Sequence, residues 1–277
     1  MSIEALIFDV DGTLADTEEA HRNAFNTAFE RMQLAWHWST SDYRDLLRTM
    51  GGKERLIHHI HSLPLSEAQR RRLIDQVPAI HAEKTRLYSS VVRSGGMPLR
   101  IGVARLLKEA LSAGIRLGIA TTTTAENVDA LLTSAFGERG LDMFGVIACG
   151  DQVREKKPAP DIYRLALNTL GVEPHNAVAF EDSSNGLKAA VSAGLWTVIT
   201  PTFWTATDDF SGAGIELPHL GDAERPLPAS STQTWAGPPW LTISTLQKLS
   251  QMPRGAHSLS VTRTPTHPSE PHHADPR

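Results

Sequence analysis

Two aspartates separated by one residue follow the first apolar run of the chain, in the stretch IFDVDGTLAD. Asp9 and Asp11 would lie close together at the point where a buried strand ends. A turn needs only one carboxylate, and two like charges beside a buried strand are unfavourable unless a cation or a proton compensates them. The pair therefore indicates chemistry.

Three further polar clusters come at points where strands are expected to end. They are Thr121 with Thr122, Lys156 with Lys157, and Glu181 with Asp182. Each cluster alone has a structural explanation as a helix cap or a solvated turn. In an open parallel sheet, however, the carboxyl ends of the strands face a shared crevice where ligands bind. We therefore expect the clusters to lie together.

The combined residue types are suited to a phosphoryl group held against a metal ion. Asp9, Asp182 and the backbone carbonyl of Asp11 supply the hard oxygen ligands that Mg²⁺ prefers. Lys157 and the hydroxyls and amides of the two threonines suit a dianionic group. One carboxylate can then attack phosphorus, and the second aspartate can protonate the leaving alcohol and later deprotonate water.

Apolar runs that alternate with helical patterns must position these groups. Strands are expected at residues 3–8, 115–120, 145–149, 177–180 and 197–199, and helices at 101–111, 125–136, 160–170 and 186–193. Repeated strand-helix units predict an α/β fold with a parallel sheet flanked by helices. From a capping-box pattern at residues 16–19 to about Tyr88 the pattern is helical throughout, so we expect an all-helical insert.

Composition argues against several classes of protein. The 277 residues carry 27 basic and 31 acidic side chains, evenly mixed, for a formal charge of −4. This charge offers no general surface for nucleic acid or an anionic membrane. No run reaches the length of about 18 apolar residues that a membrane span needs, and the single cysteine, Cys149, agrees with a reducing compartment. We expect a cytoplasmic monomer that acts on a small molecule.

Four motifs in order resemble those of the haloacid dehalogenase superfamily of phosphotransferases. They are DVDGT at residues 9–13, the Thr121 region, Lys157 in KKPAPDIY, and EDSSNG at 181–186. The resemblance spans roughly residues 3 to 200. It implies a Rossmann-like core with an inserted helical cap, and a phosphatase activity that uses Mg²⁺.

The resemblance also implies roles for individual residues. Catalytic roles fall on the nucleophile Asp9, the general acid and base Asp11, and the phosphoryl-binding residues Thr121 and Lys157. Metal binding falls on Asp9, Asp11, Asp182 and Glu181, the last in a supporting role.

The insert resembles the cap of the β-phosphoglucomutase-like subgroup and, within it, the CbbY-type proteins of Calvin-cycle operons. The segments SDYRDLLRTMGGKERL, HAEKTRLY, IATTT and EKKPAPDIYRLAL carry this closer resemblance. The CbbY-type group is identified with xylulose-1,5-bisphosphate phosphatases, which yield xylulose 5-phosphate and so remove an inhibitor of Rubisco. The resemblance implies the same sugar bisphosphate as the substrate here.

A cap that closes on a bisphosphate needs cationic donors of its own. Lys53 follows two glycines whose flexible backbone amides could also contact a phosphate. Glu18 and His21 lie one helical turn apart at the entrance of the cap, where they could contact a sugar hydroxyl. The candidate substrate-binding residues are Glu18, His21, Gly51, Gly52, Lys53, Lys84, Thr85 and, from the core, Thr122.

The reaction stays open at this point. The residues hardly separate a phosphatase from a phosphosugar mutase of the β-phosphoglucomutase type or from a phosphoglycolate-like phosphatase.

The pattern of elements also predicts a division into domains. We expect residues 1–14 and 95–225 to form the core, 15–94 the cap, and 226–277 a C-terminal extension. The extension would hold a short helix in TISTLQKL and end in a disordered tail rich in Pro, Ser, Thr and His.

Overall fold

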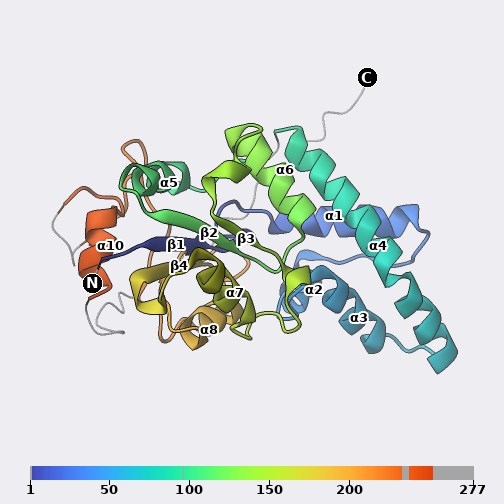
Figure 1. The fold of residues 1–277 in the computed structure, drawn as a ribbon. Helices are drawn as coiled ribbons and strands as arrows, with labels where there is room; N and C mark the ends of the chain where they lie inside the picture. Colours follow the sequence, from blue (N-terminus) through green and yellow to red (C-terminus); the bar gives the residue numbers. More distant parts are fainter. Residues whose placement is uncertain (1, 96, 233–236, 252–277) are drawn as a thin grey trace, which may run out of the picture.

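The computed structural model describes residues 2–95, 97–232 and 237–251. A six-stranded parallel sheet forms its centre, in the strand order β3-β2-β1-β4-β5-β6 (Figure 1). The strands are β1 (Ala5–Phe8), β2 (Arg116–Ala120), β3 (Val146–Ala148), β4 (Ala177–Glu181), β5 (Trp196–Ile199) and β6 (Ile215–Glu216). The first five lie where the sequence predicts strands. The sequence does not predict β6, because two residues are too few to form a pattern.

Helices cover both faces of the sheet (Figure 1). The central strands β1 and β4 are fully buried, and their side chains are apolar on both faces except for Glu181 at the end of β4. One face packs against α5 (Val103–Ser112), α6 (Ala125–Phe136) and α10 (Ile243–Leu249), and the other against α7 (Asp161–Leu170) and α8 (Ser184–Ser192). This confirms the predicted α/β class.

Four helices between β1 and α5 form the helical cap (Figure 1). They are α1 (Glu18–Arg31), α2 (Thr40–Leu46), α3 (Gly52–Ser62) and α4 (Glu67–Arg93). Their apolar faces share a buried cluster, separate from the two clusters of the sheet, that includes Phe25, Phe29, Trp38 and Tyr43. The cap therefore has a small core of its own.

The capping box expected at residues 16–19 does not form. Thr17 is the N-cap residue of α1, but its side chain makes no bond to the helix backbone. Its hydroxyl donates instead to the carboxylate of Asp11 at 2.6 Å, because a charge-assisted hydrogen bond is stronger than one to a neutral amide. Capping boxes do begin α2 and α4, at Ser39 and Ser66.

The described part of the C-terminal extension packs on the core. Leu227, Leu241 and Leu246 are buried in the same cluster as one face of the sheet, and α9 (Ala229–Thr232) lies between them along the chain. The helix expected in TISTLQKL is α10. The tail expected to be disordered lies outside the described residues from 252 onward, and the division into domains stays a prediction.

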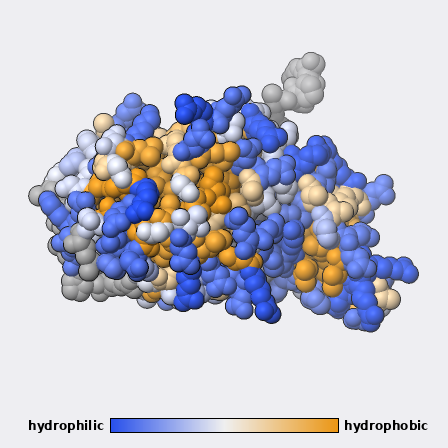
Figure 2. Space-filling model, in the orientation of Figure 1, coloured by the Kyte–Doolittle hydropathy of each residue, from blue (hydrophilic) through white to orange (hydrophobic). Residues whose placement is uncertain are grey.

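The surface is mostly hydrophilic on the face drawn in Figure 2, with apolar residues gathered on the core side, around the β3 edge of the sheet. Val146 and Ile147 of that edge strand are half-buried. Within the described residues, no helix combines the length and apolar character that crossing a membrane requires.

Candidate active site

A cavity of about 380 Å³ lies between the cap and the carboxyl ends of the strands. Predicted site residues from distant parts of the chain converge on it. From the core these are Asp9, Asp11, Thr122 and Asp182, and from the cap Glu18, His21, Gly51, Gly52, Lys53 and Lys84. The structure thus brings the strand-end clusters together with most of the cap candidates.

Three buried carboxylates meet at the bottom of this site. Possible ligand atoms of Asp9, Glu181 and Asp182 all lie within 4.8 Å of one another. Lys157 Nζ lies 2.6 Å from Asp9 Oδ1 and 2.6 Å from Glu181 Oε1. The hydroxyl of Tyr163, in α7, also donates to Glu181 Oε1 at 2.6 Å. Glu181 Oε1 is therefore engaged with two protein donors, and its supporting role at the metal stays a prediction.

The charges of this group do not balance. Burial raises the pKa of Asp9, and the negative charges of Glu181 and Asp11 add to this effect against the opposing attraction of Lys157. Burial, followed by the charges of Asp9 and Glu181, raises the pKa of Asp182 as well. One ammonium among three buried carboxylates leaves an excess of negative charge. A hard divalent cation with oxygen ligands would offset it, so these residues fit Mg²⁺.

The Lys157 ammonium is held charged by its two partners. Burial alone would lower the pKa of Lys157, but the charges of Asp9 and Glu181 outweigh burial and raise it. Lys157 is 2 % exposed and does not reach the lining of the cavity. Its position beside Asp9 still allows the ammonium to donate a hydrogen bond to a group bound there.

Two glycines permit the close approach of the acidic residues. Gly12 has φ +80°, and a Cβ at this position would lie 2.3 Å from Asp182 Oδ2. A Cβ at Gly186 would lie 1.9 Å from Glu181 Oε2. Gly12 therefore leaves room for Asp182 from the loop after β4, and Gly186 leaves room for the Glu181 side chain of its own loop.

Asp11 turns toward the cap and does not join the other carboxylates. His21 Nε2 lies 2.9 Å from Asp11 Oδ1, and Lys84 Nζ lies 2.7 Å from His21 Nδ1. A protonated lysine can only donate, so Nε2 carries the imidazole proton toward Asp11. Burial opposes ionisation of Asp11, but His21, the hydroxyl of Thr17 and the charge of Lys84 together lower its pKa. Asp11 is a carboxylate in this arrangement.

The threonines after β2 have different positions. Thr122 lines the cavity, whereas Thr121 is buried and accepts a hydrogen bond from the backbone N–H of Thr123 at 3.2 Å. Thr124 is the cap of α6, since its side chain accepts from the N–H of Asn127. Capping therefore occupies neither Thr121 nor Thr122.

The cap candidates also differ. Lys53 lies 3.3 Å from Asp151 of the core. A second ion pair of opposite direction joins Glu54 of the cap to Lys156 of the core at 2.9 Å. Thr85 is buried away from the cavity lining, so the structure does not place this predicted residue where it could contact a ligand.

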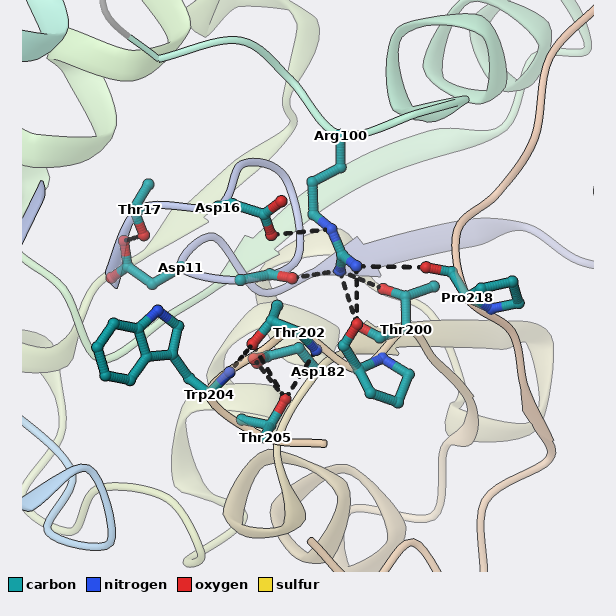
Figure 3. A network of polar contacts seen from close by, with 12 residues as sticks. Asp11, Asp16, Thr17, Arg100, Asp182, Thr200, Thr202, Trp204, Thr205 and Pro218 are labelled. Atoms are coloured by element: carbon teal, nitrogen blue, oxygen red, sulfur yellow. Dashed lines mark hydrogen bonds and ion pairs between the residues drawn. The ribbon is translucent and has the colours of Figure 1, made fainter. Parts of the chain in front are cut away.

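Sequence reasoning missed several polar groups around the site. Arg100 donates to the carbonyls of Gly12, Thr200 and Pro201, and Thr205 donates to Asp182 (Figure 3). These residues lie outside the four motifs, and no local pattern marks them. Three missed residues could have been found from a motif, because they lie within EDSSNG and line the cavity: Ser183, Ser184 and Asn185.

Comparison with known proteins identifies the class. Residues 3–194 match the haloacid dehalogenase-like hydrolase family. The chain belongs to this family, and it is an enzyme of the phosphatase class.

More closely, the chain is similar to CbbY proteins. It is 50% identical to the plasmid-encoded protein CbbY of Cupriavidus necator over 226 residues, which are 82% of this chain and 89% of the relative. The crystal structure of CbbY from Rhodobacter sphaeroides in complex with phosphate is 47% identical, with a TM-score of 0.72 over 78% of this chain and 94% of that one. A structure of the same protein with xylulose 1,5-bisphosphate is 46% identical, with a TM-score of 0.73 over 80% of this chain and 98% of that one.

Proposed function

We propose that this phosphatase is Mg²⁺-dependent and converts xylulose 1,5-bisphosphate to xylulose 5-phosphate through an aspartyl-phosphate intermediate. The observation that carries the proposal is a single cavity with carboxylates at its base and cationic side chains on its cap side. The similarity to a protein whose structure holds xylulose 1,5-bisphosphate supports the choice of sugar. Removal of a Rubisco inhibitor would be the physiological role.

The positions of the acidic residues support the following reaction. Lys157 occupies Oδ1 of Asp9, so Oδ2 is the oxygen that attacks phosphorus while the bond from phosphorus to the sugar oxygen breaks. Asp11 is a carboxylate in the free enzyme, so it first takes up one proton from solvent, and it then gives this proton to the leaving alcohol. It then takes a proton from water, which attacks phosphorus, releases phosphate and restores the Asp9 carboxylate. Mg²⁺ held by Asp9 and Asp182, with the backbone carbonyl of Asp11, would offset the charge of the phosphoryl group.

Charge at the opposite side of the cavity supports a second phosphate. Arg44, Arg48, Lys53 and Arg55 line this part of the cavity from the cap. Arg55 is already used inside the cap, where it donates to Leu46 and Tyr43. Lys53 is 42% exposed and holds only a surface ion pair with Asp151, so an anionic substrate can displace that carboxylate at little cost.

The test is a substrate panel with purified protein and Mg²⁺. Xylulose 1,5-bisphosphate, β-glucose 1-phosphate and 2-phosphoglycolate are compared by release of inorganic phosphate and by phosphorus NMR of the products. We expect the highest kcat/KM for the bisphosphate, one phosphate released per molecule, and loss of activity when a chelator removes the metal. Isomerised sugar phosphate without free phosphate would instead establish a mutase, and a preference for 2-phosphoglycolate would reject the sugar assignment.

A further inference from the structure

The segment that leaves β5, residues 200–205, connects the sheet to both the cap and the candidate metal site (Figure 3). Arg100 holds its beginning. The guanidinium donates to the carbonyl and the hydroxyl of Thr200 at 2.7 and 2.9 Å and to the carbonyl of Pro201 at 2.9 Å. The same side chain is paired with Asp16 at 3.1 Å, just before α1. The start of the segment is therefore fixed beside the point where the chain passes into the cap.

Trp204 extends from this core segment into the apolar interior of the cap. It is 7% exposed and belongs to the buried cluster of the cap, whose other buried members among the described residues all come from the cap itself. Its ring meets that of Tyr43 edge to face at 5.5 Å. The hydroxyl of Tyr43 in turn donates to Glu18, which lines the cavity, at 2.8 Å. Displacing the cap would thus expose a large apolar side chain of the core.

Thr205, the next residue, contacts the metal site. Its hydroxyl lies 3.3 Å from Asp182 Oδ2 and accepts a hydrogen bond from the backbone N–H of Thr202 at 3.0 Å. Thr202 Oγ1 lies 3.2 Å from the same hydroxyl and itself accepts from the backbone N–H of Trp204, so it can donate its own proton to Thr205. The proton of Thr205 is then directed to Asp182. Figure 3 shows that the indole of Trp204 and the hydroxyl of Thr205 leave the segment in different directions.

We propose that Thr205 is a positioning residue for the Asp182 carboxylate, and that Trp204 makes this position depend on the packing of the cap. The proposal rests on the proposed function in so far as Asp182 binds the metal. Trp204 and Thr205 are consecutive, so a displacement of the backbone that they share moves both side chains. By linkage, an arrangement of the cap that improves metal binding is itself favoured when the metal binds.

Replacement of the Thr205 hydroxyl tests whether Thr205 positions Asp182. Thr205→Val keeps the shape and removes the donor, whereas Thr205→Ser keeps the donor. We expect Thr205→Val to raise the dissociation constant for Mn²⁺, titrated calorimetrically without substrate, and the Mg²⁺ concentration for half-maximal activity by about fivefold. Thr205→Ser should restore both. Thr197→Val is the matched control, because Thr197 is also buried, in β5, but its hydroxyl donates to a backbone carbonyl.

Replacement of Trp204 tests the coupling. Trp204→Leu keeps an apolar side chain in the cap and loses the ring contact with Tyr43, and Trp204→Ala loses both. We expect both variants to weaken Mn²⁺ binding although neither touches Asp182, and combining Trp204→Leu with Thr205→Val to weaken it no further than Thr205→Val alone. The control is Phe210→Ala, which removes a buried aromatic ring that packs on Leu187 and Ile199 of the core. Thermal unfolding confirms that each variant is folded.

The possible failures are distinguishable. Wild-type metal binding in Thr205→Val would overturn the positioning role, and strictly additive effects in the double variant would overturn the coupling to the cap. If the unmodified protein neither binds Mn²⁺ nor releases phosphate from sugar phosphates, the proposed function itself is wrong. An active, metal-binding wild type with unaffected variants rejects only the present inference.

Discussion

In the proposed mechanism, the reactivity of the site depends on Asp9 and Lys157. Burial and the neighbouring negative charges raise the pKa of Asp9, and Lys157 is the cation that offsets them. A buried carboxylate is stable only with cationic partners. Incomplete compensation of its charge would make the free oxygen of Asp9 the nucleophile that attacks phosphorus.

Replacing Asp9 tests its role as the nucleophile. Asp9→Asn removes the attacking oxygen and one negative charge, so we expect turnover to fall below detection. The fold should survive, because the change relieves repulsion by Glu181 and leaves Lys157 paired with that residue. Phosphate release and thermal unfolding are the measurements. A variant with full activity would exclude the covalent mechanism.

Lys84 is expected to make both kcat/KM and the free energy of unfolding depend on pH. Burial lowers the pKa of Lys84 from its ordinary value of 10.5 to about 8, against the attraction of Asp11. Above pH 8 the cavity therefore loses a positive charge, and kcat/KM for a sugar phosphate should fall. The folded pKa is the lower one, so the unfolded chain binds more protons between about pH 8 and 10.5, and Lys84 makes the free energy of unfolding rise with pH in that window.

A pair of variants isolates this effect. Lys84→Met should have a low kcat/KM at neutral pH and no decline through pH 8. His81→Gln should keep the decline, because burial lowers the pKa of His81 to about 3 and the ring is neutral over the whole range. An unchanged decline in Lys84→Met would assign the titration to another group. Rate profiles of all three proteins against pH decide the matter.

At the scale of elements, the strands and most helices follow from local sequence, but the contacts between elements do not. The apolar run at residues 3–8 indicates a buried strand, and the period of α10 is readable in TISTLQKL. In contrast, nothing near Trp204 shows that its ring enters the cap, and nothing near Arg100 shows that it contacts the three loops after β1, β5 and β6. Such contacts join residues far apart in the chain, which no periodicity encodes.

The same limit applies to the site. The four motifs predict which carboxylates and cations approach one another, because parallel strands end at one edge of a sheet. The direction of Asp11 toward His21 could not be predicted in this way. It depends on the angle at which α1 leaves the core and on the competition of Asp11 for the hydroxyl of Thr17.

Under the proposed function, recognition of a second phosphate would depend on the N-terminus of α3. Gly51 has φ +89°, and the turn that it allows places Lys53 at the cavity. We expect Lys53→Ala to raise KM for xylulose 1,5-bisphosphate about tenfold, the effect of one lost charge-assisted contact, with little change for monophosphates. Lys108→Ala, on α5 outside the cavity lining, is the control for a lost positive charge. Equal effects on both substrate classes would refute a phosphate contact at Lys53.

At the scale of the whole molecule, the core extends beyond the sheet and its connecting helices. Leu246 in α10 is fully buried and belongs to the same cluster as Phe8 and Leu106, although the segment follows a stretch rich in Pro and Ser. The apolar surface of α5 is therefore covered by residues that come late in the chain. The C-terminal extension therefore packs on the core as far as Leu249, and we expect it to contribute to the stability of the core.

Truncating Leu246 measures that contribution. Leu246→Ala leaves a cavity against α5, so we expect the free energy of unfolding to fall by about 2–4 kcal/mol. Leu111→Ala, on α5 itself, should change it by less than about 0.5 kcal/mol, because Leu111 is 42% exposed. Denaturant unfolding gives both values, and kcat/KM should be unchanged because neither residue lines the active-site cavity. Equal, small effects would mean that α10 contributes nothing to the core, and the folding unit would then end before it.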